Sequence, residues 1–376
     1  MKDLQEIRQD IDVIDEEIVN LYQQRMKLTD EVAEYKILNN RKVLDRQREL
    51  SKLDRLGAMA ESEFNQKAVR ELFEQIMSVS RKKQYRLLNE HGKSQPLEFC
   101  CMERPDYSGA RIVFQGLEGA YSELATKEYF GEDCDCYHVE TWKDAMEAIK
   151  NHEADFAVLP IENSSAGIVS ENYDLLVEYD NYIVGEQIIR IEHALLGLPE
   201  AQIEDITSVY SHPQSLMQCS AFLEEHRTWE KHSLKNNAFA AKKIRDDGLL
   251  TQAAIASEQN ADIYGLKVLK SSVQNNKNNS TRFLIVTDRK VYNPKANRIS
   301  ICFEIPHESG SLYHMLSHFI YNNLNMTNIQ SRPLGERNWE YRFFVDFEGT
   351  FTDSAVQNAL NGLKEEATHL RILGSY

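Results

Sequence analysis

The chain has 376 residues, 27% of them charged, and a formal net charge of −16 at pH 7. This length exceeds what one hydrophobic core usually serves, so two or three domains are expected. The acidic balance argues against nucleic acid or an anionic membrane surface as the main partner, and an anionic substrate would need cations concentrated locally. No apolar stretch approaches the ~18 residues of a membrane span, and the charged N-terminus MKDLQEIRQDID is unlike a secretory signal. We therefore expect a cytoplasmic protein with no membrane partner.

The first 90 residues are expected to form long helices, because they contain one glycine, Gly57, and no proline. Apolar residues recur at spacings of three and four from Leu4 to Tyr35, which predicts one helix of about thirty-five residues. Further helices are expected at about 45–56 and 63–89. A helix as long as the first cannot bury its apolar stripe within one small domain. Partner helices and a second chain should cover it, which predicts a homodimer or a higher homo-oligomer.

Charged and polar residues occur on these predicted helices at spacings that place several of them on a shared face. Arg25 occupies an apolar seam position, where a charge is costly unless it is paired or binds a ligand. Lys36 lies about 20° from Arg25 around the helix, whereas Arg8 lies about 100° away, so if both arginines serve one ligand we expect Arg8 to come from a second chain. The other two helices add polar residues on shared faces: Asp45, Arg48 and Glu49, and Ser80 and Gln84. For each residue alone, a surface salt bridge or a device that fixes helix register is the simpler explanation.

Taken together, these residues resemble the all-α helical chorismate mutase family, over residues 1–90. Members of that family are intertwined helical dimers that rearrange the dianion chorismate to prephenate without a covalent step. The resemblance implies that Lys36 and Gln84 are catalytic donors to the ether oxygen whose bond breaks. The implied chorismate-binding residues are Arg8, Arg25, Lys36, Asp45, Arg48, Glu49, Ser80 and Gln84.

After a linker at 91–109, short apolar runs alternate with helical segments up to residue 287. This alternation predicts an α/β domain with its ligand contacts at strand ends. The first strand runs into Gly116-x-x-Gly119, which is either an anion site of free backbone amides or a plain tight turn. It matches no dinucleotide or P-loop fingerprint, so no nucleotide cofactor is expected.

The stretch NNSTRFLIV, residues 278–286, places Thr281 and Arg282 where a polar run meets an apolar strand. Alone, this pattern fits a strand cap beside a solvated charge. Other apolar strands are also followed by polar loops, LPIENSSAG and VYSHPQS, which suggests a shared cleft.

These segments, in this order, resemble prephenate dehydratase over residues 110–287. That family has two lobes like a periplasmic binding protein, and it removes water and carbon dioxide from prephenate to give phenylpyruvate. The resemblance implies that Thr281 is the catalytic donor to the departing hydroxyl, with His212 as an alternative acid, and that Arg282 holds a carboxylate. We expect Asn279 to anchor the loop. The implied prephenate-binding residues are Ser122, Asn163, Ser164, Ser211, His212, Gln214, Asn279, Arg282 and Phe283.

Residues 298–376 read as strand, helix, two strands, helix, strand, the α+β βαββαβ order of small regulatory modules. They resemble an ACT domain, which implies binding of L-phenylalanine as an allosteric inhibitor at a dimer interface. Gln330 and Tyr313 depart from the family pattern, and a purely structural dimerisation module is the alternative. The implied effector-binding residues are Gly310, Ser311, Leu312, Ser331, Arg332 and Pro333.

The scattered cysteines are expected to be reduced thiols, since Cys134 and Cys136 alone would make an incomplete metal site. We therefore expect no metal and no cofactor. The expected function is a bifunctional, feedback-regulated enzyme of phenylalanine biosynthesis with chorismate and prephenate as substrates and no nucleic-acid partner. One alternative is a mutase fused to a dehydrogenase, which would need a dinucleotide fingerprint that this sequence does not contain. The other alternative is a non-catalytic sensor of a dicarboxylate.

Overall fold

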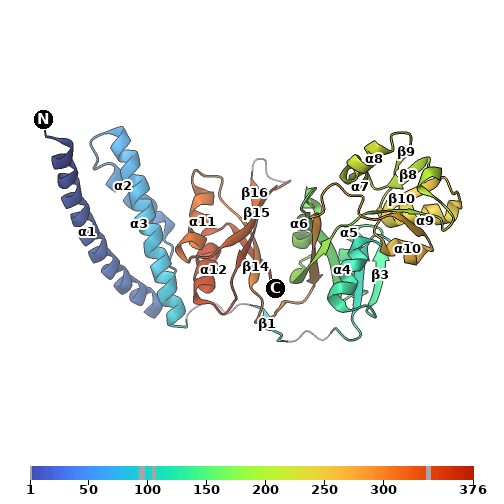
Figure 1. Ribbon diagram of the computed structural model, residues 1–376. Coiled ribbons are helices and arrows are strands. Elements are labelled where there is room, and N and C mark those ends of the chain that lie inside the picture. Colours follow the sequence, from blue (N-terminus) through green and yellow to red (C-terminus); the bar gives the residue numbers. More distant parts are fainter. Residues whose placement is uncertain (1, 93–97, 104–106, 336–339) are drawn as a thin grey trace. The chain divides into compact units, whose positions relative to one another are not determined.

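The computed structural model describes residues 2–92, 98–103, 107–335 and 340–376. It divides into two compact units, one of Met1–Glu98 with Asn297–Ile372 and one of Phe99–Ala296 with Leu373–Tyr376. The N-terminal helices and the C-terminal module therefore fold into one unit, although the α/β region separates them in the chain (Figure 1). In the described part of the chain, no helix is both long and apolar enough to cross a membrane.

Three helices form the N-terminal part of the first unit, α1 (Leu4–Leu38), α2 (Arg46–Gly57) and α3 (Glu63–Glu90). Each begins at a side chain that accepts backbone N–H groups of the first turn: Asp3, Asp45 and Ser62. The three helices expected from the apolar periodicity are confirmed. Within one chain the apolar stripe of α1 stays uncovered, since its members from Leu4 to Leu21 are 41–64% exposed.

The C-terminal module follows the expected strand–helix–strand–strand–helix–strand order. Its elements are β14 (Arg298–Glu304), α11 (Ser311–Tyr321), β15 (Met326–Pro333), β16 (Tyr341–Glu348), α12 (Ser354–Glu366) and β17 (His369–Ser375). The strands lie in the order β15-β16-β14-β17, with the first three antiparallel. Helix α3 packs against α11 and α12, so the module and the N-terminal helices share one interface within this unit.

The second unit has two lobes, each with its own set of paired strands and its own core, and the end of β17 pairs with β6 (Tyr182–Arg190) of the first lobe. The first sheet runs β3 (Asp135–Val139), β2 (Arg111–Gln115), β4 (Phe156–Asn163), β12 (Ser280–Thr287), β6. The second runs β11 (Lys267–Lys270), β7 (Ala194–Gly197), β10 (Gln252–Ala256), β8 (Ser208–Ser211), β9 (Glu230–Ser233). The expected α/β alternation is confirmed, and the cleft between the two lobes is where a ligand site belongs.

Strand β12 is the element that completes the first lobe. It returns from the second lobe and inserts between β4 and β6, antiparallel to both. This register sets Thr281, near the start of β12, directly opposite Asn163, the last residue of β4. Two polar residues that are far apart in sequence therefore meet where these two strands end, beside residues of the second lobe.

Candidate active sites

A cavity of about 330 Å³ lies among the three N-terminal helices. Seven of the eight residues expected to bind chorismate line it: Arg25, Lys36, Asp45, Arg48, Glu49, Ser80 and Gln84. Arg8 is exposed near the start of α1 and lies outside the cavity. Its contribution from a second chain stays a prediction.

Hydrogen bonds within the cavity fix several of these side chains before any ligand binds. The Arg25 guanidinium donates to Ser80 Oγ. Lys36 Nζ donates to the carbonyl oxygen of Val43 at 2.5 Å, in the loop before α2. Gln84 Nε2 donates one hydrogen to the carbonyl of Ser80 at 3.2 Å, which leaves its second hydrogen for a ligand. The donors are therefore held in place by the fold.

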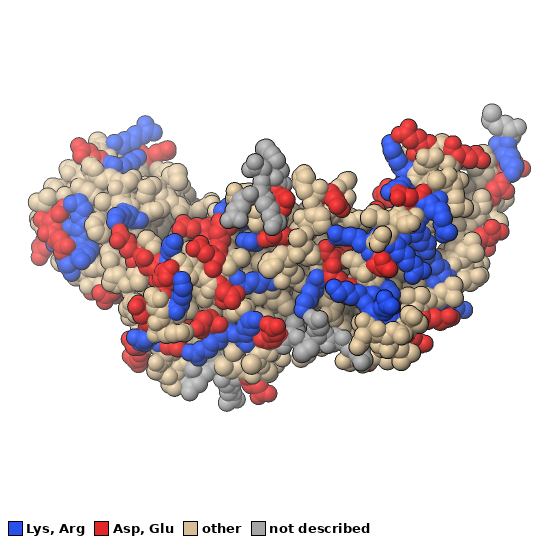
Figure 2. Space-filling view, turned by 180° about the vertical axis from the view of Figure 1, so that it is seen from behind, with Lys and Arg blue, Asp and Glu red and all other residues tan. Residues whose placement is uncertain are grey.

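Positive charge is in excess in this cavity. Five cations line it (Arg25, Lys36, Arg48, Lys52 and Arg81) against two carboxylates (Asp45 and Glu49). Figure 2 shows Lys and Arg side chains gathered over the N-terminal helices, although the whole chain is acidic. Burial lowers the pKa of Arg25 and of Lys36, an effect that Glu49 opposes in both. A bound dianion would favour the charged forms and suits this excess.

Lys52 and Arg81 also line this cavity, although they were not among the residues expected from the sequence. Lys52 lies three residues after Glu49 on α2, so helical spacing was a usable signal. Arg81 follows Ser80 directly, so it points about 100° away from Ser80 around α3. The shared face of Ser80 and Gln84 therefore gave no indication that Arg81 lines the cavity.

A second cavity, of about 190 Å³, lies between the two lobes of the second unit. Six of the residues expected to bind or convert prephenate line it: Ser122, Asn163, His212, Gln214, Thr281 and Phe283. Among its lining residues there is no Lys, Arg, Asp or Glu. The expectation that an anionic substrate meets concentrated cations therefore fits the first cavity and not this one.

The Thr281 hydroxyl has a defined hydrogen-bonding role in this cavity. Asn163 Nδ2 donates to Thr281 Oγ1 at 2.8 Å. The amide orientation of Asn163 is fixed, because the backbone N–H groups of Ser165 and Ala166, which can only donate, point at its Oδ1 at 3.0 and 2.8 Å. Thr281 Oγ1 thus accepts from Asn163, and its own proton remains free to be donated into the cavity.

The turn at Gly116 and Gly119 is used internally. The N–H of Gly116 donates to the Val139 carbonyl at 3.0 Å, and that of Gly119 donates to a carboxylate oxygen of Glu123 at 2.5 Å. Since these two donors are already paired, the plain tight turn accounts for this segment better than an anion site.

Arg282 does not point into the cavity. Side chains alternate across a strand, so Arg282 lies on the opposite face of β12 from Thr281. Its Nε donates to Glu186 Oε2 at 2.7 Å, and its Nη2 donates to the Tyr376 hydroxyl at 2.7 Å. The expectation that it binds a carboxylate beside Thr281 is wrong in this structure, because an intramolecular carboxylate already holds it.

Three further expected residues support the site without lining it. Ser164 Oγ donates to Asn279 Oδ1 at 3.2 Å, and the Asn279 carbonyl accepts from the N–H of Ile191 at 2.8 Å, so Asn279 anchors the loop as expected. Ser211 is fully buried and donates to the Ile255 carbonyl at 2.6 Å. These residues hold backbone that carries the cavity's lining.

Several lining residues were missed, above all His193 and Gln218. His193 Nε2 lies 3.0 Å from Gln218 Oε1, and burial lowers the pKa of His193. Gln218 is four residues after Gln214, so helical spacing pointed to it. Burial also lowers the pKa of His212, whose Nδ1 accepts from the N–H of Gln214 at 3.2 Å, so His212 is a neutral helix cap rather than a ready acid.

In the described residues there is no group of three or more His, Cys, Asp or Glu side chains that could hold a metal ion. Cys134 and Cys136 are free thiols. Neither cavity offers a ligand set for a metal.

Comparison with known proteins agrees with this division into two sites. Residues 7–85 match the family chorismate mutase type II, and residues 112–291 match the family prephenate dehydratase. The bifunctional chorismate mutase/prephenate dehydratase of Buchnera aphidicola subsp. Schizaphis graminum is 33% identical over 382 residues, covering 100% of this chain and 96% of that protein. The chain belongs to the bifunctional chorismate mutase/prephenate dehydratase family. It rearranges chorismate to prephenate and converts prephenate to phenylpyruvate in phenylalanine biosynthesis.

Other relatives cover one or both parts. The bifunctional enzyme of Escherichia coli (strain K12) is 31% identical over 378 residues, covering 98% of this chain and 95% of that protein. Arogenate dehydratase/prephenate dehydratase 2, chloroplastic, of Arabidopsis thaliana is 40% identical over 281 residues, covering 72% of this chain and 73% of that protein. A solved structure of prephenate dehydratase from Arthrobacter aurescens in complex with L-Phe has 29% identity and a TM-score of 0.66, covering 71% of this chain and 89% of that chain.

Proposed function

We propose that the cavity among the N-terminal helices is the chorismate mutase site, with Lys36 and Gln84 as donors to the breaking ether oxygen. The observation that carries this assignment is the convergence of five cations and two fixed donors on one cavity of an acidic protein. The rearrangement is unimolecular, so the site needs only to hold a compact conformer and stabilise developing charge. Arg25 and Arg48 hold the substrate carboxylates, and Asp45, Glu49 and Ser80 orient the rest of the ring.

The mutase site is completed by a second chain in this proposal. The uncovered apolar stripe of α1, with Leu4 and Leu21 each more than 60% exposed, is the surface on which a second copy packs. Such packing would bring Arg8 from the second chain to the cavity that this chain's own Arg8 does not reach. Light scattering should give at least a dimer, and a monomer with full mutase activity would contradict this arrangement.

For the dehydratase reaction, we assign Thr281 as the donor to the departing ring hydroxyl. The carbon–oxygen bond breaks as the carboxylate leaves as carbon dioxide, and the released electron pair completes the aromatic ring. As the Thr281 proton moves toward the leaving oxygen, negative charge grows on Oγ1. The Asn163 amide, which already donates to Oγ1 at 2.8 Å, stabilises that charge. Enclosure between two lobes keeps competing water out.

The variant Thr281→Ala tests this assignment directly. We expect dehydratase kcat to fall by roughly 10²- to 10³-fold, since one positioned donor is removed. Thr281→Ser keeps the hydroxyl and should retain most of the activity, and mutase activity should not change in either variant. Phenylpyruvate formation by Thr281→Ala at the parent rate would overturn the assignment.

We also propose that the C-terminal module is an ACT domain that binds L-phenylalanine and inhibits the enzyme. The proposal is supported by its βαββαβ order and by the solved relative that was crystallised with L-Phe. Gly310 caps α11 with a φ of +83°, a conformation that suits glycine, and the segment Ser331–Pro333 ends the strand β15. The proposed effector residues are Gly310, Ser311, Leu312, Ser331, Arg332 and Pro333.

Calorimetric titration with L-phenylalanine, alongside both activities, tests this regulation. Saturable binding with inhibition is the expected result, and Gly310→Val should weaken binding because a β-branched residue is strained at positive φ. Absence of both binding and inhibition would leave the module a structural dimerisation unit.

A further inference from the structure

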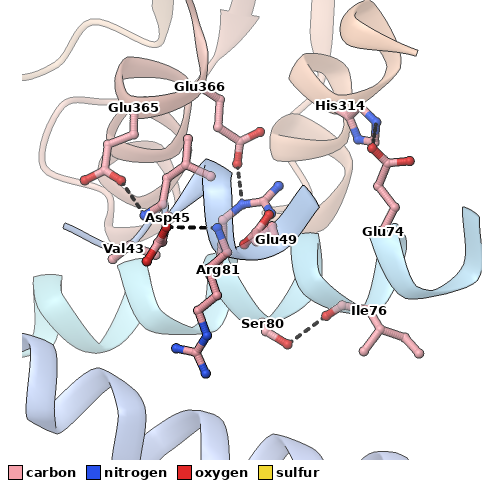
Figure 3. A network of polar contacts seen from close by, with 12 residues as sticks. Val43, Asp45, Glu49, Glu74, Ile76, Ser80, Arg81, His314, Glu365 and Glu366 are labelled. Carbon is pink, nitrogen blue, oxygen red and sulfur yellow. Dashed lines mark hydrogen bonds and ion pairs between the residues drawn. The ribbon is translucent and has the colours of Figure 1, made fainter. Parts of the chain in front are cut away.

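Arg81 connects the mutase cavity to the C-terminal module (Figure 3). Its side chain is 8% exposed and lies between two carboxylates. Its Nη1 forms an ion pair with Glu49 of α2, which lines the cavity, and its Nε donates to Glu366 Oε1 of α12 at 2.8 Å. One guanidinium therefore bridges a residue of the mutase cavity and the last residue of α12.

Neighbouring groups of opposite charge stabilise the charged forms of both Arg81 and Glu366. Burial disfavours the charged form of Arg81, but Glu366 and Glu49 together hold its pKa above the ordinary value. Burial would likewise raise the pKa of Glu366, but His318 and Arg81 hold it at about 2. His318 Nε2 lies 3.3 Å from Glu366 Oε2. A buried cation that loses one of two carboxylate partners must move or draw closer to the other, because unpaired buried charge is costly.

The neighbouring residue, Glu365, makes a second and independent connection. Its Oε2 accepts from the backbone N–H of Leu44 at 3.0 Å and from the Tyr85 hydroxyl at 2.9 Å. Leu44 stands between Val43, whose carbonyl holds Lys36 Nζ, and Asp45, which caps α2. The last turn of α12 therefore contacts both the loop that fixes Lys36 and the cation that pairs with Glu49.

A third contact ties the module's other helix to the same helix α3. His314 Nε2 of α11 lies 3.3 Å from Glu74 Oε1, and Lys82 Nζ donates to Ser317 Oγ at 2.7 Å. These contacts hold α11 on α3, and α11 packs in turn against α12, whose last residue pairs with Arg81.

We propose that Glu365 and Glu366 are positioning residues for the chorismate mutase reaction, acting through Leu44 and Arg81 respectively. They set the orientation of Glu49 and of the Lys36–Val43–Asp45 segment from outside the cavity. The proposal rests on the assignment of Glu49 and Lys36 to the mutase site. It makes full mutase activity dependent on the C-terminal module, so a displacement of α12 would change chorismate turnover without any ligand reaching the cavity.

The test uses the full chain with Glu366→Gln, which keeps the size of the side chain and removes its charge. We expect mutase kcat to fall roughly tenfold, with a smaller change in KM, because a modest misplacement of a reacting group costs this much or more. The matched control is Glu348→Gln, which removes one carboxylate from the exposed end of β16 and should leave both activities unchanged. Dehydratase activity should equal the parent's in both variants.

A double-variant cycle separates positioning from general stability. In an Arg81→Met background, Glu366→Gln should cause no further loss of mutase kcat, since the bridge is already broken. Independent losses that add would overturn the proposal, as would parent mutase kcat in Glu366→Gln. Should Glu366→Gln fail to fold, Arg81→Lys serves instead, because a lysine keeps the charge but cannot reach both carboxylates with a planar fork. Parent kcat in a folded Arg81→Lys variant would equally overturn it.

The variant Glu49→Gln distinguishes failure of this proposal from failure of the site assignment. If Glu49→Gln keeps the parent mutase activity, the assignment of Glu49 to the site is wrong and the positioning role of Glu366 falls with it. If Glu49→Gln loses activity while Glu366→Gln does not, the site stands and only the positioning proposal is wrong.

Discussion

The two cavities that we assign to chorismate and prephenate are lined by opposite kinds of side chain. The mutase cavity is lined by five cations and two carboxylates carried on three helices. The dehydratase cavity is lined by amides, hydroxyls, imidazoles and apolar groups, with no Lys, Arg, Asp or Glu among its lining residues. We propose that the first binds its substrate through fixed charges, and the second through neutral dipoles whose orientation is set by neighbouring backbone.

The difference follows from the two reactions. Rearrangement of chorismate needs a substrate held in one conformer while charge separates, which fixed charges achieve without any proton transfer. Loss of water and carbon dioxide needs a donor to the departing hydroxyl, and a nearby carboxylate would compete for that proton. In this proposal a neutral cavity leaves the Thr281 proton directed at the substrate, because Asn163 donates to the Thr281 hydroxyl.

The largest effect is expected from removing a charge in the mutase cavity. Lys36→Ala should lower mutase kcat/KM by roughly 10³-fold, since a positioned donor to developing charge is lost. Lys27→Ala, on an exposed position of the same helix outside the cavity, is the control and should have little effect. Dehydratase activity on added prephenate should not change. If mutase activity falls by less than tenfold, Lys36 is not a catalytic donor.

The converse experiment adds a charge to the neutral cavity. Asn163→Asp keeps the shape but replaces the donor to Thr281 with an acceptor, so the threonine proton would be held by the new carboxylate. We expect dehydratase kcat to fall roughly 10²-fold. Asn278→Asp adds the same charge on an exposed turn nearby and controls for the long-range electrostatic effect of the added charge. Equal effects of the two variants would argue that charge, and not the hydrogen bond to Thr281, is responsible.

Raised ionic strength should change the KM values of the two reactions differently, although by a smaller factor than the substitutions above. Raising ionic strength from 0.1 to 1 M shortens the Debye length from about 10 Å to about 3 Å. KM for chorismate should rise several-fold because its site attracts a dianion by charge, whereas KM for prephenate should change little. Steady-state kinetics with each substrate on one preparation measures both. A parallel rise in the two KM values would break the contrast between the cavities.

The smallest effect concerns acid stability of the second unit. Burial lowers the pKa values of His193 and His212 below their ordinary value of 6.5. Below about pH 6.5 the unfolded chain therefore binds more protons than the folded chain, and the free energy of unfolding falls as pH falls. Urea unfolding followed by tryptophan fluorescence should show this decline, and it should be shallower in a His193→Gln/His212→Gln variant. An unchanged slope would mean that these histidines titrate normally.

Much of the mutase site was predictable from sequence, because helical spacing places Arg25 and Lys36 on one face and Ser80 and Gln84 on another. The dehydratase site was predictable where polar residues follow strands, as at Asn163 and Thr281. Arg282 shows the limit of that logic, since a residue adjacent to a site residue on a strand faces the other way. The Arg81–Glu366 pair, 285 residues apart, depends on how two modules pack and left no sequence signal.

We propose that the two reactions occur in two separate cavities carried by separate units. The most direct measurement mixes equal amounts of Lys36→Ala and Thr281→Ala chains and supplies chorismate as the only substrate. Each variant alone should fail to form phenylpyruvate at an appreciable rate, and Thr281→Ala alone should accumulate prephenate. We expect the mixture to form phenylpyruvate, because prephenate made by one chain is consumed by the other. A mixture that remains as inactive as either variant alone would contradict the assignment of the two reactions to two separate cavities.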